Sequence, residues 1–222
     1  MKGFPFSSIL AVTLVFMFSG CHFAGRGVKG SGVRKTEMRD VASFKSIESD
    51  GAYEIEVNCQ QALSVQIEGD DNLLPLVKTD VRDGVLYITN PQPYHTRQPV
   101  VLRIAAPNIE RIVSNGAGNF NVSNLKNDAF ELHSTGATSF NASGQTKSVR
   151  IETSGAGKIN AGELRAEKAN VSISGAASVD VFASDQLDVN LSGVGHVSYS
   201  GNPKTVNKNI NGLGSVSAKG SS

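Results

Sequence analysis

The sequence has little charge and few of the side chains that hold metals or catalyse reactions. Charged residues make up 18% of its 222 positions, the net charge is +1, and there are four histidines and two cysteines. No basic cluster forms the electrostatic footprint of a nucleic-acid-binding protein, and no His or acidic residue recurs at metal-ligand spacing. We therefore expect no nucleic-acid partner, no metal site and no cofactor.

Helix-forming patterns are also scarce. The chain has 23 glycines and is dense in Ser, Thr, Asn and β-branched residues, which favour turns and strands over helices. The composition predicts an all-β protein.

The N-terminus has the pattern of a processing signal. Lys2 precedes a short apolar run over 9–18, and Ser19-Gly20 stand directly before Cys21. A run this short is typical of a cleaved signal rather than of a membrane-spanning helix. The small residues before the cysteine resemble a bacterial lipobox, which implies that Cys21 is the lipidated first residue of an outer-membrane lipoprotein. Such a lipoprotein could face either the periplasm or the cell surface. The alternative is an ordinary secretory signal over 1–21.

The rest of the chain divides into three parts. Residues 22–36 are rich in glycine and lack apolar periodicity, which predicts a flexible tether. Residues 37–107 are expected to form an irregular N-terminal β part, and residues 108–219 a regular array of coils. Lipidation of Cys21 would leave Cys59 without a disulfide partner, and its place in an alternating apolar run predicts a buried side chain.

A glycine-centred segment recurs six times through the second half of the chain. Successive leading glycines are 20, 19, 20, 18 and 19 residues apart. A period of this length indicates a solenoid, in which each repeat is one coil that buries its apolar face against its neighbours. The six glycines are Gly116, Gly136, Gly155, Gly175, Gly193 and Gly212.

Both flanks of each glycine alternate in polarity, which predicts a strand on either side of a sharp corner. In the second coil, for example, Leu132 precedes Gly136, and Phe140 and Ala142 follow it. We expect glycine at the corner for two reasons: it tolerates a positive φ, and it leaves room where one coil lies directly on another. The alanine that follows most of these glycines indicates a narrow inner corner.

The signatures of other solenoids are missing. The apolar phase of hexapeptide β-helices, the Gly-Gly-x-Gly-x-Asp calcium repeat and the Leu/Asn framework of leucine-rich repeats do not occur. The pattern therefore predicts a right-handed parallel β-helix with about 19 residues per coil, since crossovers between parallel strands are generally right-handed.

Stacking such coils about 4.8 Å apart would align equivalent residues into ladders. One outward ladder begins Arg111, Glu131, Arg150 and alternates in charge, which contributes to register more than to stability. A second outward ladder could hydrogen-bond from rung to rung as a purely structural feature, or could face a ligand. Its members, our candidate ligand-facing residues, are Asn121, Asn141, Asn160 and Asp180.

The two ends of the repeat depart from the pattern. Asp50-Gly51-Ala52 looks like a divergent seventh copy, and further strands are expected at 63–67, 86–88 and 100–104. In the last coil, Lys208 stands where other coils have an apolar residue. A charge in an edge strand discourages end-to-end stacking, so this coil is expected to end the solenoid.

These features together resemble one protein family. The segments that carry the resemblance are Phe44 and Ile47 before Asp50-Gly51-Ala52, Asp-Asp-Asn-Leu-Leu at 70–74, Gly-Val-Leu-Tyr-Ile at 84–88, and the Gly-Ala-Gly series. Over about residues 37–219 the chain resembles the "putative auto-transporter adhesin, head GIN domain" family of secreted or lipid-anchored bacterial proteins. The resemblance implies a pectin-lyase-like β-helix, a role in cell adhesion and no catalytic residue.

The residues themselves also argue against an enzyme. Acid–base work on a glycosidic bond needs clustered carboxylates or bases, whereas Asp180 is the only acid in its ladder and Glu131 lies between two arginines. We expect a non-enzymatic envelope lipoprotein that binds an extended glycan or protein ligand on its lateral face. The alternatives are a polysaccharide lyase or hydrolase and a periplasmic structural scaffold.

Overall fold

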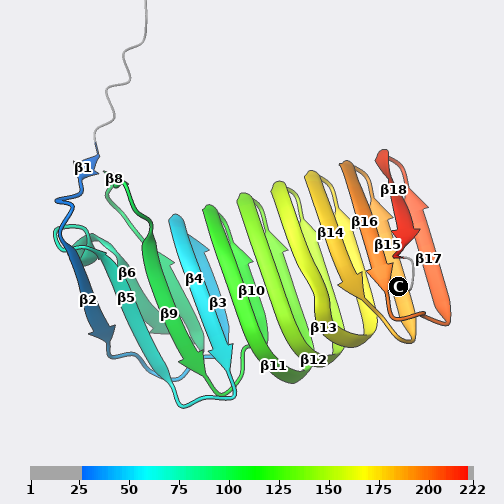
Figure 1. Cartoon of the computed structure of the whole chain (residues 1–222), viewed down its shortest axis with the longest axis horizontal. Helices are drawn as coiled ribbons and strands as arrows, with labels where there is room; N and C mark the ends of the chain where they lie inside the picture. The colour runs from blue at the N-terminus through cyan, green and yellow to red at the C-terminus, as the bar shows by residue number, and fades with distance from the viewer. Residues whose placement is uncertain (1–26, 220–222) are drawn as a thin grey trace, which may run out of the picture.

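The computed structural model describes residues 27–219, and within them the chain folds almost entirely as strands. Figure 1 shows these strands stacked side by side along one axis, from β2 at one end to β17 and β18 at the other. The signal expected over 1–21, with its lipidation site Cys21, lies outside the described residues.

The elements are labelled as in Figure 1. One short 3₁₀ helix, η1 (Leu74–Leu76), occurs in the described part of the chain. The strands are β1 (Val28–Lys29), β2 (Arg34–Arg39), β3 (Ser46–Asp50), β4 (Ala52–Cys59), β5 (Ser64–Asp70), β6 (Lys78–Arg82), β7 (Val85–Thr89), β8 (Tyr94–His95), β9 (Val100–Ala106), β10 (Arg111–Ser114), β11 (Ala117–Ser134), β12 (Ala137–Thr153), β13 (Ala156–Ile173), β14 (Ala176–Phe182), β15 (Gln186–Leu191), β16 (Val194–Ser200), β17 (Thr205–Ile210) and β18 (Leu213–Ala218).

Each regular coil has two faces and two corners. Successive coils pair in parallel and in register, so that Ala117 aligns with Ala137 and Phe120 with Phe140. The predicted parallel β-helix is therefore confirmed. β11, β12 and β13 each continue through the second corner and so contribute to both faces. We call the face made by residues that directly follow a glycine corner, such as 117–122, the ladder face. The face made by residues that lead up to the next glycine corner, such as 128–134, is the charged face.

The corner glycines are explained by close stacking alone. A Cβ added to Gly136 would collide with the carbonyl oxygen of Gly116 in the coil beneath, and one added to Gly155 would collide with that of Gly136. Neither glycine has a φ in the left-handed region. The expected need for positive φ is therefore wrong for the six repeat glycines, although Gly51 of the divergent copy has φ 154°, while the expected lack of room is confirmed.

Positive φ occurs instead at the other corner, which we call the bulged corner (residues 123–127, with counterparts at 143–146, 162–166, 183–186 and 201–204). Strand register shifts there, between Val122 and Leu125 and again in the next coil. Asn124 has φ 59° and Gly144 has φ 131°. These residue types occupy that region at low cost, so the chain bulges where such residues stand.

The alanines after the corner glycines point outwards. Ala117, Ala137 and their counterparts are exposed, and so are Val194 and Leu213 in the last two coils, with exposed fractions of 56% and 77%. The narrow inner corner inferred from these alanines is therefore wrong. Strand alternation accounts for this result, because the next residue faces inwards and is buried where it has a side chain, as at Thr138 and Ala177.

The divergent copy at residues 46–59 is confirmed, but its place in the stack is not sequential. β3 pairs with β10 and β4 with β11 on one side. On the other side, β7 pairs with β3 and β9 with β4. The β3–β4 rung, although first in sequence, therefore lies in the middle. The β7–β9 rung, which follows it in sequence, lies on its N-terminal side, and the rung that begins with β10 lies on its other side.

Antiparallel strands close the N-terminal end. β5 pairs with β9, β6 with β7, and β2 with β5. Composition predicted a flexible tether over 22–36, but within this range β1 pairs in parallel with β8 in a separate two-stranded sheet, and Arg34–Thr36 belong to β2 of the closure. Arg34 begins β2 and donates through Nη1 to the carbonyl of Pro99 at 3.0 Å. These partners are distant in sequence, so no local pattern indicated them.

The buried side chains form one continuous cluster from Phe44 to Val197. Near its middle, the ring centroid of Phe140 lies 6.2 Å from that of Phe120 and 6.0 Å from that of Phe130. Cys59 is buried in the same cluster, as predicted, and burial raises the pKa of its thiol.

We expect Lys208→Leu to cause end-to-end association. Lys208 lies on the terminal coil above Val189, and its Nζ donates to the carbonyl of Val216 at 3.0 Å. The charge therefore lies over the open end of the core, where leucine would present an apolar edge. Light scattering after size-exclusion chromatography should show a mass that rises with concentration. Lys158→Leu, an equal change on the ladder face, should give the same mass as the wild type, and equal behaviour of the two variants would contradict the role given to Lys208.

Candidate ligand-binding face

The structure brings the four predicted ladder residues into one column. Asn121 aligns with Asn141, Asn141 with Asn160, and Asn160 with Asp180. Asn141 Nδ2 donates to Asn121 Oδ1 at 2.8 Å, and Asn160 Nδ2 to Asn141 Oδ1 at 3.5 Å. Asp180 Oδ2 pairs with the ammonium of Lys219. The ladder is thus a hydrogen-bonded stack of amides that ends in a neutralised carboxylate.

The amide ladder lies beside a groove of about 880 Å³. Asn121 and Asn141 are exposed, while Asn160 and Asp180 are half-buried. The first three line the groove, and Asp180 does not. The groove therefore runs along the stack, across the coils rather than within one of them.

Sequence reasoning missed the other side of this groove. Glu56 aligns with Asn121 and Arg103 aligns with Glu56, so both extend the ladder towards the N-terminal end. Met38, with an exposed fraction of 63%, and Gln66 also line the groove. The position of Glu56, five residues after Gly51, was a signal that could have been used. Arg103 and Met38 carried no such signal, because β9 and β2 reach this face out of chain order.

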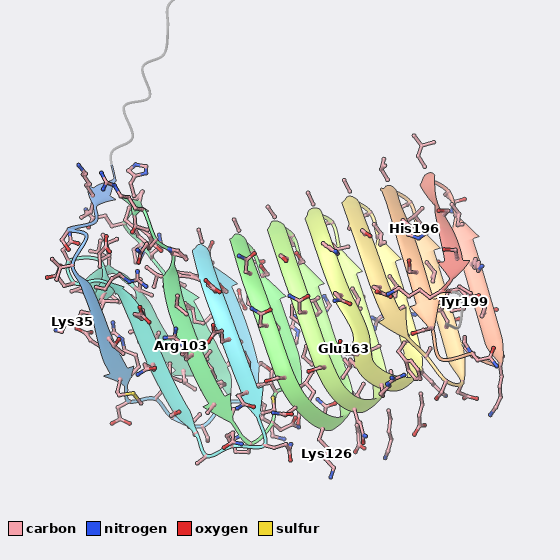
Figure 2. The ribbon with its side chains drawn as sticks, in the orientation of Figure 1. Lys35, Arg103, Lys126, Glu163, His196 and Tyr199 are labelled. Atoms are coloured by element: carbon pink, nitrogen blue, oxygen red, sulfur yellow. The ribbon has the colours of Figure 1, made fainter. Side chains whose placement is uncertain are left out.

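Most charges at the groove pair with one another, whereas the exposed Glu163 in its lining makes no ion pair within the described structure. Arg103 Nη1 lies 2.7 Å from Glu68 Oε2, and Arg103 Nε lies 3.2 Å from Glu56 Oε2. Arg34 completes the network at 3.1 Å from Glu68. Hydrogen bonds from Arg103 and Arg34 lower the pKa of Glu68, and the bond to Glu68 raises the pKa of Arg103. Figure 2 places Arg103 and Glu163 on this part of the surface.

Glu68→Gln should reduce the loss of stability that the protein undergoes as the pH falls into the acid range. The pKa of Glu68 is lower in the fold than its ordinary value of about 4.5, so its stabilisation is complete above pH 4.5 and is lost as the pH falls through the folded pKa. Urea midpoints measured from neutral to acid pH should therefore differ between wild type and variant at neutral pH and converge in acid. Glu163→Gln, a charge removal without an ion pair in the described structure, is the control. A Glu68→Gln profile that runs parallel to wild type would contradict this linkage.

The acids at the centre of the charged face pair with neighbouring bases. Arg111, Glu131 and Arg150 align in one column as predicted, and Arg111 Nε lies 3.8 Å from Glu131 Oε2. Arg150 does not pair with Glu131; its Nε lies 2.7 Å from Oε1 of Glu152, two residues further along the same strand. His133 lies between the two acids, 3.5 Å from Glu131 and 3.0 Å from Glu152. Glu131 and Glu152 thus each have a basic partner. The described residues contain no group of three or more His, Cys, Asp or Glu able to hold a metal ion.

A histidine–serine cluster lies near the C-terminal end of the ladder face. His196 Nδ1 is 2.8 Å from Ser215 Oγ, and Nε2 is 3.0 Å from Ser198 Oγ and 3.3 Å from Ser217 Oγ. A catalytic triad would place a carboxylate on the ring nitrogen that does not face the nucleophile. Here both ring nitrogens face hydroxyls, and the acid of the neighbouring column, Asp180, pairs with Lys219.

Comparison with known proteins identifies the family. The family model described as "Putative auto-transporter adhesin, head GIN domain" matches residues 43–203. The chain belongs to this family. Membership of an adhesin family indicates a protein of the cell envelope or cell surface. No helix in the described residues is long and apolar enough to cross a membrane. No functionally curated protein matches the sequence.

Solved structures of similar fold include proteins from Bacteroides and Parabacteroides species. A protein described as a putative adhesin from Bacteroides fragilis superposes with a TM-score of 0.68 at 20% identity, covering 87% of this chain and 100% of its own. A putative adhesin from Parabacteroides distasonis gives 0.56 at 20% identity, covering 87% and 100%. A protein named a putative lipid binding protein from the same species gives 0.51 at 19% identity, covering 87% and 99%. At these identities the likeness concerns the fold of the head GIN domain.

Proposed function

We propose that this head GIN domain protein is a non-enzymatic adhesin, anchored in the cell envelope through Cys21, whose ladder face binds an extended glycan or protein. The observation that carries the proposal is the column of aligned asparagines along an open groove, in a chain of an adhesin family. Amide side chains both donate and accept hydrogen bonds, so a ladder of them suits a ligand that repeats such groups along its length.

The pairing of most charges that line this groove supports a mainly polar contact, with Glu163 as its unpaired carboxylate within the described structure. The acids and bases of the groove are held mainly by one another, through Arg103, Glu56 and Glu68. The amides of Asn121 and Asn141 are exposed and already aligned by their own hydrogen bond. A ligand therefore meets donors and acceptors whose positions are set before binding, which lowers the entropic cost of association.

An array of glycans and extracellular proteins, probed with the soluble chain 22–222, tests the proposal. The variant Asn121→Ala/Asn141→Ala/Asn160→Ala should bind any retained ligand about tenfold or more weakly, because three aligned hydrogen bonds are lost. The matched control, Asn170→Ala/Asn190→Ala/Asn209→Ala, removes three asparagines from the charged face and should bind as wild type does. Absence of any ligand, together with unchanged adhesion of cells that lack the gene, would overturn the proposal.

Protease treatment of intact cells tests whether the protein lies on the cell surface or in the periplasm. Loss of the protein on treatment would place it on the outer surface, as an adhesin requires, whereas protection would favour a periplasmic scaffold. Metabolic labelling with an alkyne fatty acid should tag the wild-type chain and leave Cys21→Ser untagged. Labelling of both, or of neither, would contradict the lipid anchor.

A further inference from the structure

A second and larger groove, of about 1040 Å³, lies at the bulged corner. It runs across successive coils from Asn108 to Ser184, away from the amide ladder. One column of its lining consists of Lys126, Gln145 and Arg165, which align from coil to coil. Figure 2 shows Lys126 at this edge of the solenoid, with its side chain directed away from the body. Lys126 and Arg165 are thus two rungs apart, which corresponds to about 10 Å.

Neither of these two cations makes an ion pair within the described structure, and of the other charged residues that line the groove only Glu167 shares this property there. Three of the four carboxylates that line the groove face a base. Glu110 lies 2.9 Å from Lys45, Asp128 lies 2.8 Å from Lys147, and Glu131 lies 3.8 Å from Arg111, whereas Glu167 makes no ion pair within the described structure. Lys126 and Arg165 remain available to an anionic group.

Arg165 is held in place by an aromatic ring. Its guanidinium carbon lies 4.4 Å from the ring centroid of Phe182. The same ring packs against the backbone of Gly201, where an added Cβ would come within 3.0 Å of it. A guanidinium that rests on a fixed ring keeps its edge free and orientated for a carboxylate, with little further loss of side-chain entropy.

The groove also contains acceptors that lack donors. The Oδ1 atoms of Asn108 and Asn127 are buried and have no hydrogen-bond partner in the protein. Asn127 is fixed in this orientation because its Nδ2 donates to the carbonyl of Ile109 at 2.9 Å. Buried acceptors of this kind are stabilised by a donor, and hydroxyl groups supply one.

We propose that the bulged-corner groove binds a linear acidic glycan, with carboxylates on Lys126 and Arg165 and hydroxyls donating to Asn108 and Asn127. A sugar acid carries both groups on one rigid ring, whereas an acidic peptide carries carboxylates on flexible arms without hydroxyls beside them. A carboxylate on every second sugar suits cations two rungs apart. The site goes beyond the adhesin function assigned to the ladder face, since it uses another edge of the solenoid and other residues.

The test uses hyaluronate, a linear glycan with one carboxylate per disaccharide, and the chain 22–222. Wild type should bind hyaluronate with an affinity that falls as salt rises. It should bind carboxyl-reduced hyaluronate and polyglutamate at least about tenfold more weakly, because each lacks one of the two kinds of group. Lys126→Gln/Arg165→Gln should lose about tenfold or more in hyaluronate affinity.

Two controls separate this site from general charge and from the ladder. Lys158→Gln/Arg97→Gln removes the same two charges elsewhere and should bind as wild type does, as should the triple asparagine variant of the ladder. Equal loss in both charge variants, or polyglutamate binding as tight as that of hyaluronate, would overturn the proposal. Circular dichroism of each variant should match wild type, since all four substituted cations are at the surface.

Discussion

Gly155→Ala is expected to destabilise the solenoid by about 3 kcal/mol or more. The new methyl group would collide with the carbonyl oxygen of Gly136 in the coil beneath. That oxygen also accepts the hydrogen bond of the Ala156 N–H at 3.0 Å, so a shift that relieves the collision weakens the ladder at the corner. Urea unfolding followed by far-ultraviolet circular dichroism measures the loss.

The matched control is Gly162→Ala, at the bulged corner of the same coil. A Cβ there would meet the carboxyl group of Asp180 at 3.4 Å, an ordinary contact, and its φ is not in the left-handed region. We expect a change within about 0.5 kcal/mol. If the two alanine variants were equally stable, the coils would not be stacked as closely at the glycine corner as described.

Phe140→Ala should cost about 4 kcal/mol. The ring is 1% exposed and lies between those of Phe120 and Phe130, each about 6 Å away between centroids. Its removal leaves a cavity in the middle of a continuous core, which the flanking rungs cannot fill because their hydrogen-bond register holds them apart. The midpoint of thermal unfolding and the urea midpoint should both fall.

Phe140→Leu distinguishes lost volume from lost aromatic contact. Leucine retains most of the buried volume, so we expect a cost of about 1 kcal/mol. A leucine variant as unstable as the alanine variant would show that the ring–ring contacts, rather than the filled volume, stabilise this layer.

The two proposed sites divide the solenoid into functionally distinct edges. The amide ladder consists of neutral groups that bind one another from rung to rung, while the bulged corner places unpaired cations beside buried acceptors. Both run across the coils, so both suit ligands that are long rather than compact. Each is tested with variants that leave the other intact.

The repeat itself could be predicted from the sequence in detail. Each coil stacks on the next with almost no offset, so equal position in the repeat means proximity in space. For that reason the corner glycines, the amide ladder of Asn121, Asn141 and Asn160, the charge ladder from Arg111, and the seventh copy around Gly51 all followed from period and alternation. The structure confirms their placement.

Direction within the repeat was harder to infer. The small size of Ala117 and its counterparts indicated an inner corner, but they lie outside, because size alone does not tell which side of a strand is buried. Positive φ was expected at the corner glycines and occurs at Asn124 and Gly144. Both errors concern the point after a corner at which inward and outward side chains begin to alternate again. That point depends on the backbone conformation of the corner, which the length of the repeat does not reveal.

By itself the sequence determined the period, the parallel stacking, the family and the composition of each ladder, because these depend on repetition between neighbours. Only the tertiary structure decided how the N-terminal half joins the stack. It placed β9 beneath β4, closed the end with antiparallel β2, and so brought Arg103 and Met38 to the ladder face. It also set Arg165 on Phe182. Such contacts join segments that differ in position within the repeat, and their pairing depends on the geometry of the folded chain, which the period does not specify.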